Sequence, residues 1–513
     1  MNGKKSTALF LLCAVLLLFV FTSCGTDADE NEKTNNGETN KNNNTANGSA
    51  AEETTAPEFQ PLKDAGYDGY EFRILGAGTS PVIWDYAAAS SINETAAETE
   101  TGEPINDTVF RRNRDVEELY NIIITPLYPG DTRSAIEQYI LKMFMSGEDT
   151  YDAAFVLGSS ATKTILASNQ YTYDLFDVGN LNLSASWWDK QSVADLSVAK
   201  QLHMVTGDIS IFSALSVDHL FLNKNMAELY ELDNAYDVVR QGKWTWDVLT
   251  EMSRKVSRDL NGDGVLTIED QFGICCETSN MRQIVISSGA RISSKDADDL
   301  PVLTVNTENT VTVFDYALQS FLNKDISILA NEYAGKYKDI WNDMLLPKFR
   351  NDEFLFIALP LLYALDFRNM ESDFGILPYP KLSEHQSEYY TLVGRYFSTY
   401  IYIPTTCPDS GRSGAVIDAL GYYSQKYVKP AVIDVTVTNK LIRDNDSADM
   451  VNLLLDTRVF DLALLYNWEN LTDTLLYPVA QTRSNGFASN YAKNEEKIKA
   501  AIQKTISEMQ GQE

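Results

Sequence analysis

A twelve-residue stretch from Asp259 to Asp270 carries the side chains best suited to hold a metal ion. Oxygen-bearing side chains stand at its positions 1, 3, 5, 9 and 12, and glycine stands at position 6. This spacing matches an EF-hand type of loop, in which carboxylate oxygens and the carbonyl at position 7 surround calcium. The predicted ligands are Asp259, Asn261, Asp263, Val265 (through its carbonyl), Thr267 and Asp270.

Two departures from the EF-hand pattern leave an alternative open. The last ligand is Asp270 where glutamate is usual, and residues 272–276 have the pattern of a strand rather than a second helix. A polar turn without metal accounts for the same residues. If calcium binds, we expect a structural ion that stabilises its part of the fold. No organic cofactor is expected.

Aromatic residues next to planar polar side chains form a second set of candidates. Flat apolar rings stack on sugar rings, while carboxylate, amide and guanidinium groups bond to hydroxyls. This combination predicts a carbohydrate-binding site. The candidate residues are Trp84, Asp85, Trp187, Trp188, Asp208, Tyr363, Arg395 and Tyr396.

For some of these candidates a purely structural role is the alternative to ligand binding. Trp187 and Trp188 lie in a polar stretch that fits neither helix nor strand, so we expect one in the core and at least one in a cleft. Asp208 lies at a turn beside strands, where capping is the alternative to contact with a ligand in the cleft. Trp84 and Asp85 follow a predicted strand, where the carboxyl ends of open α/β sheets face a ligand crevice.

Sequence motifs of enzymes are absent. The three histidines are far apart, and there is no HExxH, G-x-S-x-G or P-loop pattern. Residues 76–81 resemble the start of a dinucleotide fingerprint, but Pro81 replaces its third glycine. The chain is therefore not expected to be an enzyme.

The N-terminus has the parts of an export signal. Lys4 and Lys5 precede an apolar run over 8–21, which is shorter than the roughly 20 residues that a membrane-spanning helix needs. Residues 21–24 (FTSC) resemble a bacterial lipobox. We therefore predict a signal peptide over 1–23 and lipidation of Cys24, although an ordinary signal followed by a chance cysteine is the alternative.

Residues 24–65 are predicted to be a disordered tether. Up to residue 57 they are rich in Asn, Thr, Glu, Gly and Ala, with no aliphatic side chain larger than alanine. Such a segment buries too little apolar surface to offset its ordering entropy. The expected location is the extracellular face of the cell membrane, with the protein held through its lipid.

The charge balance limits the kinds of partner. There are 42 basic and 72 acidic residues, for a formal net charge of −30. This charge argues against nucleic-acid binding and against electrostatic attachment to anionic lipid. The chain is expected to be a monomer. Cys275 and Cys276 are adjacent, and a half-buried strand is favoured there over a vicinal disulfide.

Strand and helix patterns alternate after the tether. Strands are predicted at 70–75, 122–127 and 153–157, and helices at 106–120, 134–145 and 161–167. This order indicates right-handed crossovers and a mostly parallel sheet. A second α/β region follows, with helices predicted at 246–256, 313–322, 336–349, 414–425, 447–465 and 491–509.

Ordered landmarks along the chain resemble one family, the extracellular solute-binding proteins of ABC transporters that include maltose-binding protein (family 1). The landmarks are 102–107 (GEPIND), 205–209 (VTGDI), 221–224 (FLNK), 242–247 (GKWTWD), 375–380 (GILPYP) and 443–445 (RDN). The likeness is greatest to the longer, lipid-anchored Gram-positive members. Many sugar-binding members have tryptophan where Leu361 stands here, so Tyr363 would have to supply the stacking ring.

The resemblance implies an α/β clamp of two lobes, each with a mixed, mostly parallel sheet flanked by helices. The first lobe would take 66–220 and 376–428, and the second 221–375 and 429–510. It further implies a receptor that captures a solute, expected to be an oligosaccharide, and delivers it to the permease subunits of an ABC transporter. The alternative is a surface-anchored glycan-adhesion module or polysaccharide-active enzyme.

Overall fold

The computed structural model describes residues 59–62, 65–80, 91–167, 169–367, 370–437 and 445–511. Cys24, the signal peptide and most of the tether lie outside these residues, as do Trp84 and Asp85. Within the described ranges, no helix combines the length and apolar character needed to cross a membrane. Lipid anchoring therefore stays a prediction.

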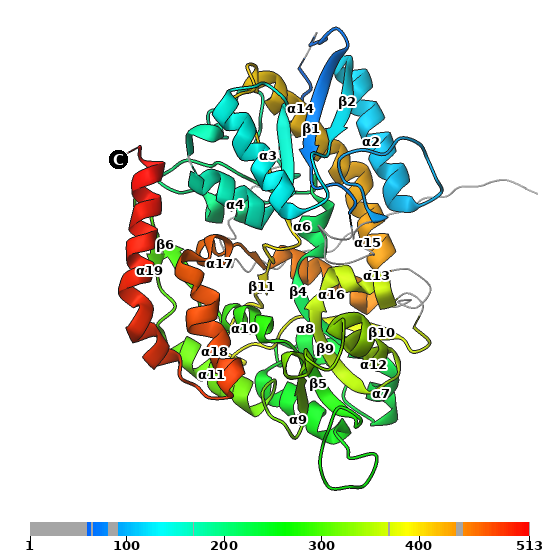
Figure 1. The fold of residues 1–513 in the computed structure, drawn as a ribbon. Coiled ribbons are helices and arrows are strands. Elements are labelled where there is room, and N and C mark those ends of the chain that lie inside the picture. Colours follow the sequence, from blue (N-terminus) through cyan, green and yellow to red (C-terminus); the bar gives the residue numbers. More distant parts are fainter. Residues whose placement is uncertain are drawn as a thin grey trace, which may run out of the picture. The chain divides into compact units, whose positions relative to one another are not determined.

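The first sheet has four strands in the order β12-β3-β1-β2, of which β1 and β2 are labelled in Figure 1. β1, β2 and β3 run parallel, as predicted, and β12 joins β3 antiparallel. Every residue of β3 is buried, as expected for a strand inside a mostly parallel sheet. The strands are β1 (Tyr70–Gly76), β2 (Ile122–Leu127), β3 (Ala153–Leu157) and β12 (Thr399–Tyr402).

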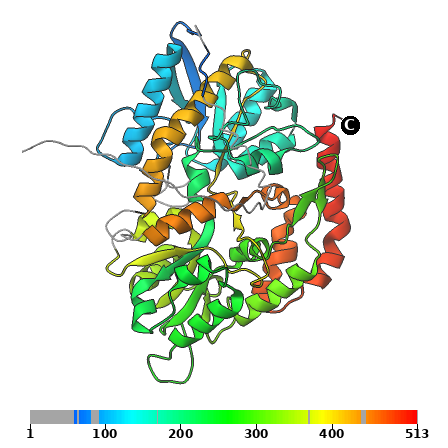
Figure 2. The same cartoon turned by 180° about the vertical axis from the view of Figure 1, so that it is seen from behind.

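Capping residues explain where the helices next to this sheet begin. Glu103 accepts from the Asn106 amide at the start of α2, and Thr132 accepts from the Ala135 amide at the start of α3. α2 packs against α14 and α15, which lie beside it in both views (Figures 1 and 2). The helices are α2 (Pro104–Tyr120), α3 (Arg133–Ser146), α4 (Gly158–Ala167), α5 (Lys190–Leu196), α6 (Ile211–Leu215), α14 (Ser410–Tyr423) and α15 (Lys429–Val437).

The second sheet has five strands in the order β10-β4-β9-β5-β8. β5, β8 and β9 run parallel, while β4 is antiparallel to both of its neighbours. The predicted strand at 272–276 is confirmed, and Cys275 and Cys276 in it are buried free thiols. The strands are β4 (Asp218–Asn223), β5 (Phe272–Cys276), β8 (Ser327–Leu329), β9 (Phe354–Pro360) and β10 (Phe374–Leu377).

The lobe boundaries drawn from the sequence need correction. The predicted limits after 220 and 375 cut through β4 and β10, which both belong entirely to the second sheet. α15, predicted in the second lobe, packs against α2 of the first. The landmark residues could not locate the crossovers because strand pairing depends on distant partners that the local sequence does not reveal.

The remaining helices follow the predicted order, with one interruption. The helix expected over 447–465 is two helices separated by a short strand, which pairs with residues 391–392. Asp461, two residues after this strand, caps the second helix by accepting from the Ala463 amide at 3.0 Å. The elements are α7 (Lys224–Leu229), α8 (Ala235–Arg240), α9 (Trp246–Val256), α10 (Met281–Ser287), α11 (Glu308–Gln319), α12 (Leu346–Arg350), α13 (Ala364–Phe367), α16 (Asn445–Asp456), α17 (Leu462–Tyr466), α18 (Tyr477–Thr482), α19 (Phe487–Met509), β6 (Ser293–Lys295), β7 (Pro301–Leu303), β11 (Thr391–Leu392) and β13 (Arg458–Val459).

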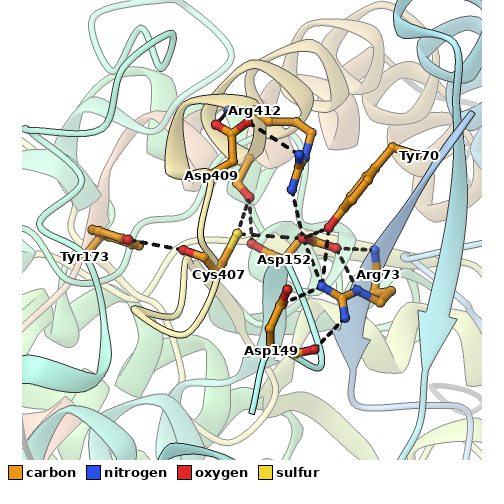
Figure 3. Close-up of polar contacts among 9 residues, drawn as sticks. Tyr70, Arg73, Asp149, Asp152, Tyr173, Cys407, Asp409 and Arg412 are labelled. Atoms are coloured by element: carbon orange, nitrogen blue, oxygen red, sulfur yellow. Dashed lines mark hydrogen bonds and ion pairs between the residues drawn. The ribbon is translucent and has the colours of Figure 1, made fainter. Parts of the chain in front are cut away.

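The buried carboxylate of Asp152 joins three elements of the first lobe. Figure 3 shows Tyr70, Arg73 and Arg412 converging on it. The Arg73 guanidinium and the Tyr70 hydroxyl donate to its two oxygens at 3.0 and 2.7 Å, and Arg412 lies at 3.7 Å. Arg412 also stacks over the Tyr70 ring, with its Cζ 3.6 Å from the ring centroid. The charge is thus fully partnered and holds β1, the start of β3 and α14 together.

Replacing Asp152 should therefore destabilise the protein strongly. Asp152→Ala removes the anion that compensates two guanidinium groups, and we expect a loss of about 3 kcal/mol in unfolding free energy. Urea denaturation followed by circular dichroism measures it. Asp149→Ala is the matched control, because Asp149 also pairs with Arg73 but its side chain is 40% exposed; its loss should stay below about 1 kcal/mol. Equal losses for the two variants would contradict this role.

Candidate functional site

Two acidic side chains lie at one edge of the second sheet. β4 runs opposite to β5 and β9, so its first residue, Asp218, lies at the same edge as Glu277, which follows β5 directly. Tyr379, two residues beyond β10, lies there too. The carboxyl ends of strands in open α/β sheets face the ligand crevice. This edge is therefore the candidate site.

The first sheet contributes the segment before β12. Because β12 is antiparallel to β3, the residues that precede it meet the carboxyl end of β3. The amide of Gly158 donates to the carbonyl of Ser398 at 3.0 Å, and the amide of Ser159 donates to the carbonyl of Arg395 at 3.1 Å. These bonds place Arg395 and Tyr396, two of the predicted site residues, at the strand ends.

Guanidinium groups from both lobes surround the ring of Tyr396. The Cζ atoms of Arg395, Arg133 and Arg282 lie 4.7, 5.9 and 6.0 Å from its centroid. Arg133 belongs to α3 and Arg282 to α10, so the guanidinium groups come from both lobes. Arg282 and Arg395 also line one small cavity of about 10 Å³. The ring itself is 37% exposed and can still contact a ligand.

Burial changes the acidity of the two carboxyl groups beside Arg282. Burial raises the pKa of Glu277 to about 7, against the opposing effects of a hydrogen bond from the Trp341 side chain and the charge of Arg282. Burial raises the pKa of Asp218 to about 6, again opposed by Arg282. Among the described residues, neither Oδ2 of Asp218 nor the hydroxyl of Tyr379 has a hydrogen-bond partner. Such buried, unpaired polar atoms are expected where a ligand completes a site.

Trp341 adds a second exposed aromatic surface. It starts a short π-helical turn, Trp341–Leu345, and its side chain is hydrogen-bonded to Glu277. The residue is 40% exposed. The site therefore offers two exposed rings, Trp341 and Tyr396, next to carboxyl and guanidinium groups. This is the chemistry that binds a hydroxyl-rich ligand with apolar ring faces.

Trp187 and Trp188 lie elsewhere, in the core of the first lobe. Each is 2% exposed, and both indole N–H groups donate to the same oxygen of Asp418 at 2.9 Å. The expectation of a cleft-facing tryptophan does not fit this arrangement, because no ring face is open to a ligand. Gly207 lies so close to this segment that a Cβ there would be 2.3 Å from the Trp187 carbonyl oxygen. The backbone around the two tryptophans is therefore tightly packed.

Asp208 and Tyr363 also have local partners. Asp208 pairs with Lys429 at 3.0 Å and accepts from Gln425 at 3.0 Å. It lines a separate small cavity of about 30 Å³. Tyr363 ends a 3₁₀ turn, Leu361–Tyr363, directly after β9, but it is only 5% exposed. The structure thus brings Arg395 and Tyr396 to the site, while Trp84 and Asp85 lie outside the described residues.

In the predicted calcium loop, the acidic side chains bond to the loop's own backbone. Asp259 accepts from the amides of Gly262 and Gly264, each at 2.7 Å, and Asp270 accepts from those of Leu260 and Thr267. Across the described residues, no three His, Cys, Asp or Glu side chains gather closely enough to hold a metal. This geometry is that of a polar turn, and calcium binding stays a prediction.

Four residues of the site were not found from the sequence: Asp218, Glu277, Arg282 and Trp341. Glu277 had a usable signal, because it directly follows the confirmed strand 272–276 and the strand-end rule applied to Trp84 fits it equally. Asp218 begins a strand, and only its antiparallel pairing brings it to this edge. Arg282 and Trp341 lie in helical segments with no distinguishing pattern.

Comparison with known proteins relates the chain by structure alone. No protein-family profile matches the sequence, and no curated protein matches it. Among solved structures, it is similar to UgpB from Mycobacterium tuberculosis in complex with glycerophosphocholine, with a TM-score of 0.54 at 13% identity over 86% of this chain and 100% of that one. The chain has the two-lobed fold of the ABC-transporter solute-binding proteins.

Two further structures with this solute-binding fold come from Listeria monocytogenes. One is the maltose-binding protein MalE in complex with maltose, with a TM-score of 0.52 and 11% identity, covering 87% of this chain and 99% of that one. The other is an ABC substrate-binding protein in complex with cycloalternan, with a TM-score of 0.50 and 12% identity, covering 87% and 100%. The predicted fold class, two α/β lobes with mixed sheets, is confirmed.

The pKa of Glu277 predicts a pH dependence of stability. Its value in the folded protein, about 7, lies above its ordinary value of 4.5, so between these pH values the folded state binds more protons than the unfolded state. Stability should therefore fall as the pH rises from about 4.5 to 7. Glu277→Gln cannot titrate, so its unfolding free energy relative to wild type should rise by about 3 kcal/mol across that range.

Thermal unfolding at a series of pH values from 4.5 to 8 measures the difference between wild type and Glu277→Gln. Glu251→Gln, on the exposed side of α9, controls for the loss of one carboxylate at the surface. A constant difference between wild type and Glu277→Gln at all these pH values would show that Glu277 does not titrate in this range.

Proposed function

We propose that this protein is a cell-surface receptor that captures an oligosaccharide between its lobes and delivers it to an ABC transporter permease. The observation that carries the proposal is the pair of exposed rings, Trp341 and Tyr396, beside Glu277, Arg282 and Arg395 at the strand ends of both lobes. The fold supports it as well, since similar structures were solved with maltose and cycloalternan.

Anchoring at Cys24 is part of the proposal. The lipid would hold the receptor on the extracellular face of the membrane, and the polar tether would let it reorient near its permease. We propose that it acts as a monomer without nucleic-acid partners, in keeping with a net charge of −30.

The competing hypothesis is a polysaccharide-active enzyme, and the raised pKa values of Asp218 and Glu277 are what favour it. A glycosidase needs two carboxyl groups on opposite sides of the scissile bond. Asp218 is only 5% exposed, which suits a group that orients other residues rather than one that reaches a substrate. We therefore propose a non-catalytic receptor, as opposed to an enzyme or a static adhesion module.

Removing either exposed ring should weaken sugar binding. For Trp341→Ala and Tyr396→Ala we expect a loss of affinity of about 10- to 100-fold, because each variant deletes a stacking surface. Isothermal titration calorimetry against a panel of soluble oligosaccharides provides the measurement. The wild-type protein should bind at least one member with micromolar or better affinity.

Phe176→Ala is the matched control. Phe176 is an exposed aromatic residue, at 47%, but it belongs to the segment after Tyr173, which contacts Cys407 at the other edge of the first sheet. Its removal should leave affinity unchanged. Chromatography of the incubated sugars completes the test, since release of any product would overturn the receptor assignment in favour of an enzyme.

We also propose that the loop over 259–270 binds calcium weakly as a structural ion, on the spacing of its ligands. Calcium at millimolar concentration should raise the midpoint of thermal unfolding by about 2–4 °C relative to chelator. The double variant Asp259→Ala and Asp263→Ala should lose that response. If calcium leaves the wild-type midpoint unchanged, the loop is a polar turn only.

A further inference from the structure

Two arginines at the candidate site donate only to neutral groups. Nε of Arg282 donates to the carbonyl of Ser279 at 3.0 Å. Arg395 donates to the carbonyl of Leu465 at 3.0 Å and to the hydroxyl of Tyr396 at 2.7 Å. Within the described part of the chain, neither guanidinium has a carboxylate oxygen within 4.0 Å. Both charges are therefore uncompensated by direct ion pairs.

The described arginines differ in this respect. Arg258 and Arg291 also lie over tyrosine rings without a carboxylate oxygen within 4.0 Å. Several other partly buried arginines do lie within 4.0 Å of one: Arg73, Arg350, Arg412, Arg458 and Arg483. Arg112 is fully buried in the core, where it donates to the carbonyl of Glu94 at 2.8 Å. Arg282 and Arg395 instead line a cavity.

The acidic groups near this cavity form no direct ion pair with the two arginines among the described residues. Asp461 lines it too, but its carboxylate accepts from the backbone amides of Ile292, Ser293 and Ala463. Asp218 and Glu277 act on Arg282 from a distance. Burial raises their pKa values to about 6 and about 7, so near neutral pH Glu277 is only partly ionised, while Asp218 keeps most of its negative charge.

A third cation strengthens the local field. The Cζ atom of Arg133 lies 5.9 Å from the centroid of the same Tyr396 ring. Arg133 has an acidic residue, Glu137, one helical turn away on α3. We therefore take Arg282 and Arg395 as the two groups that bind the ligand's charge. A guanidinium fork pairs with a planar oxyanion through two parallel hydrogen bonds, which gives strength and orientation.

We infer that the captured solute is an acidic saccharide, whose oxyanion lies between Arg282 and Arg395 while its sugar rings contact Tyr396 and Trp341. The inference rests on the proposed receptor function and narrows its ligand class. The shared chemistry is an oxyanion on a sugar, which a uronic-acid carboxylate, a sulfate ester or a phosphate ester would each supply.

The test is a comparison of matched neutral and acidic ligands by isothermal titration calorimetry on the purified protein. Digalacturonate and galactobiose of the same linkage differ only in the group at C6. A sulfated disaccharide and a sugar phosphate distinguish the possible sources of the oxyanion. We expect at least one acidic ligand to bind about 100-fold more tightly than its neutral counterpart, with affinity that falls as salt is raised.

Substitutions then assign the preference to the two arginines. Arg282→Gln and Arg395→Gln should each lower affinity for the acidic ligand by about 10- to 100-fold, and by a clearly smaller factor for the matched neutral ligand, which loses hydroxyl contacts but no ion pair. Arg282→Lys should recover only part of the loss, because it restores the charge without the fork. Lys499→Gln, on the exposed face of α19, is the control for loss of one positive charge and should change nothing. Circular dichroism checks that each variant is folded.

The outcomes separate the two proposals. If neutral and acidic saccharides bind equally, or the neutral ones bind more tightly, the acidic-ligand inference is overturned while the sugar receptor stands. If no saccharide of either kind binds, both the receptor's ligand class and the inference fail. A preference for acidic ligands that survives both glutamine variants would overturn the assignment to Arg282 and Arg395.

Discussion

The backbone hydrogen bonding of residues 216–218 is the constraint on which the rest of the site depends. The carbonyl of Ser216 accepts from the amide of Gly394 at 3.1 Å, and the carbonyl of Val217 accepts from the amide of Leu361 at 3.0 Å. Directly afterwards the chain enters β4, which is hydrogen-bonded on both sides and buried at all six positions. Residues 216–218 thus connect the end of β9, the residue before Arg395 and the start of β4.

That connection positions the chemistry on both sides. Asp218 begins β4 and is one residue from the Val217 bond, while Arg395 follows Gly394 directly. The backbone at neither residue can move far without breaking a hydrogen bond of this crossover. A clamp that opens and closes needs such a rigid reference point, since ligand contacts made only in the closed state are what shift its equilibrium.

Two buried aspartates, Asp152 and Asp218, differ in whether their oxygens have hydrogen-bond partners. Asp152 is fully buried and both of its oxygens accept hydrogen bonds, so it holds three elements in place. Asp218 is nearly as buried, but its Oδ2 lacks a partner among the described residues, and its pKa rises. The first arrangement contributes to stability. The second leaves polar capacity unfilled at the strand ends, where a ligand binds in proteins of this fold class.

The sequence by itself determined several of the elements and, through the family resemblance of its landmarks, the fold class. Hydrophobic periodicity located β2, β3, β5 and α9 to the residue, because buried faces repeat every 2 or about 3.6 residues along the chain. It also drew attention to Arg395 and Tyr396. Only the tertiary structure decided where the lobes divide, that Trp187 and Trp188 share Asp418 in the core, and that Asp218, Glu277 and Arg282 meet. These depend on contacts between residues far apart in the chain, such as Arg282 with Tyr396 and β4 with β9, and no local pattern encodes which distant partner fills a given space.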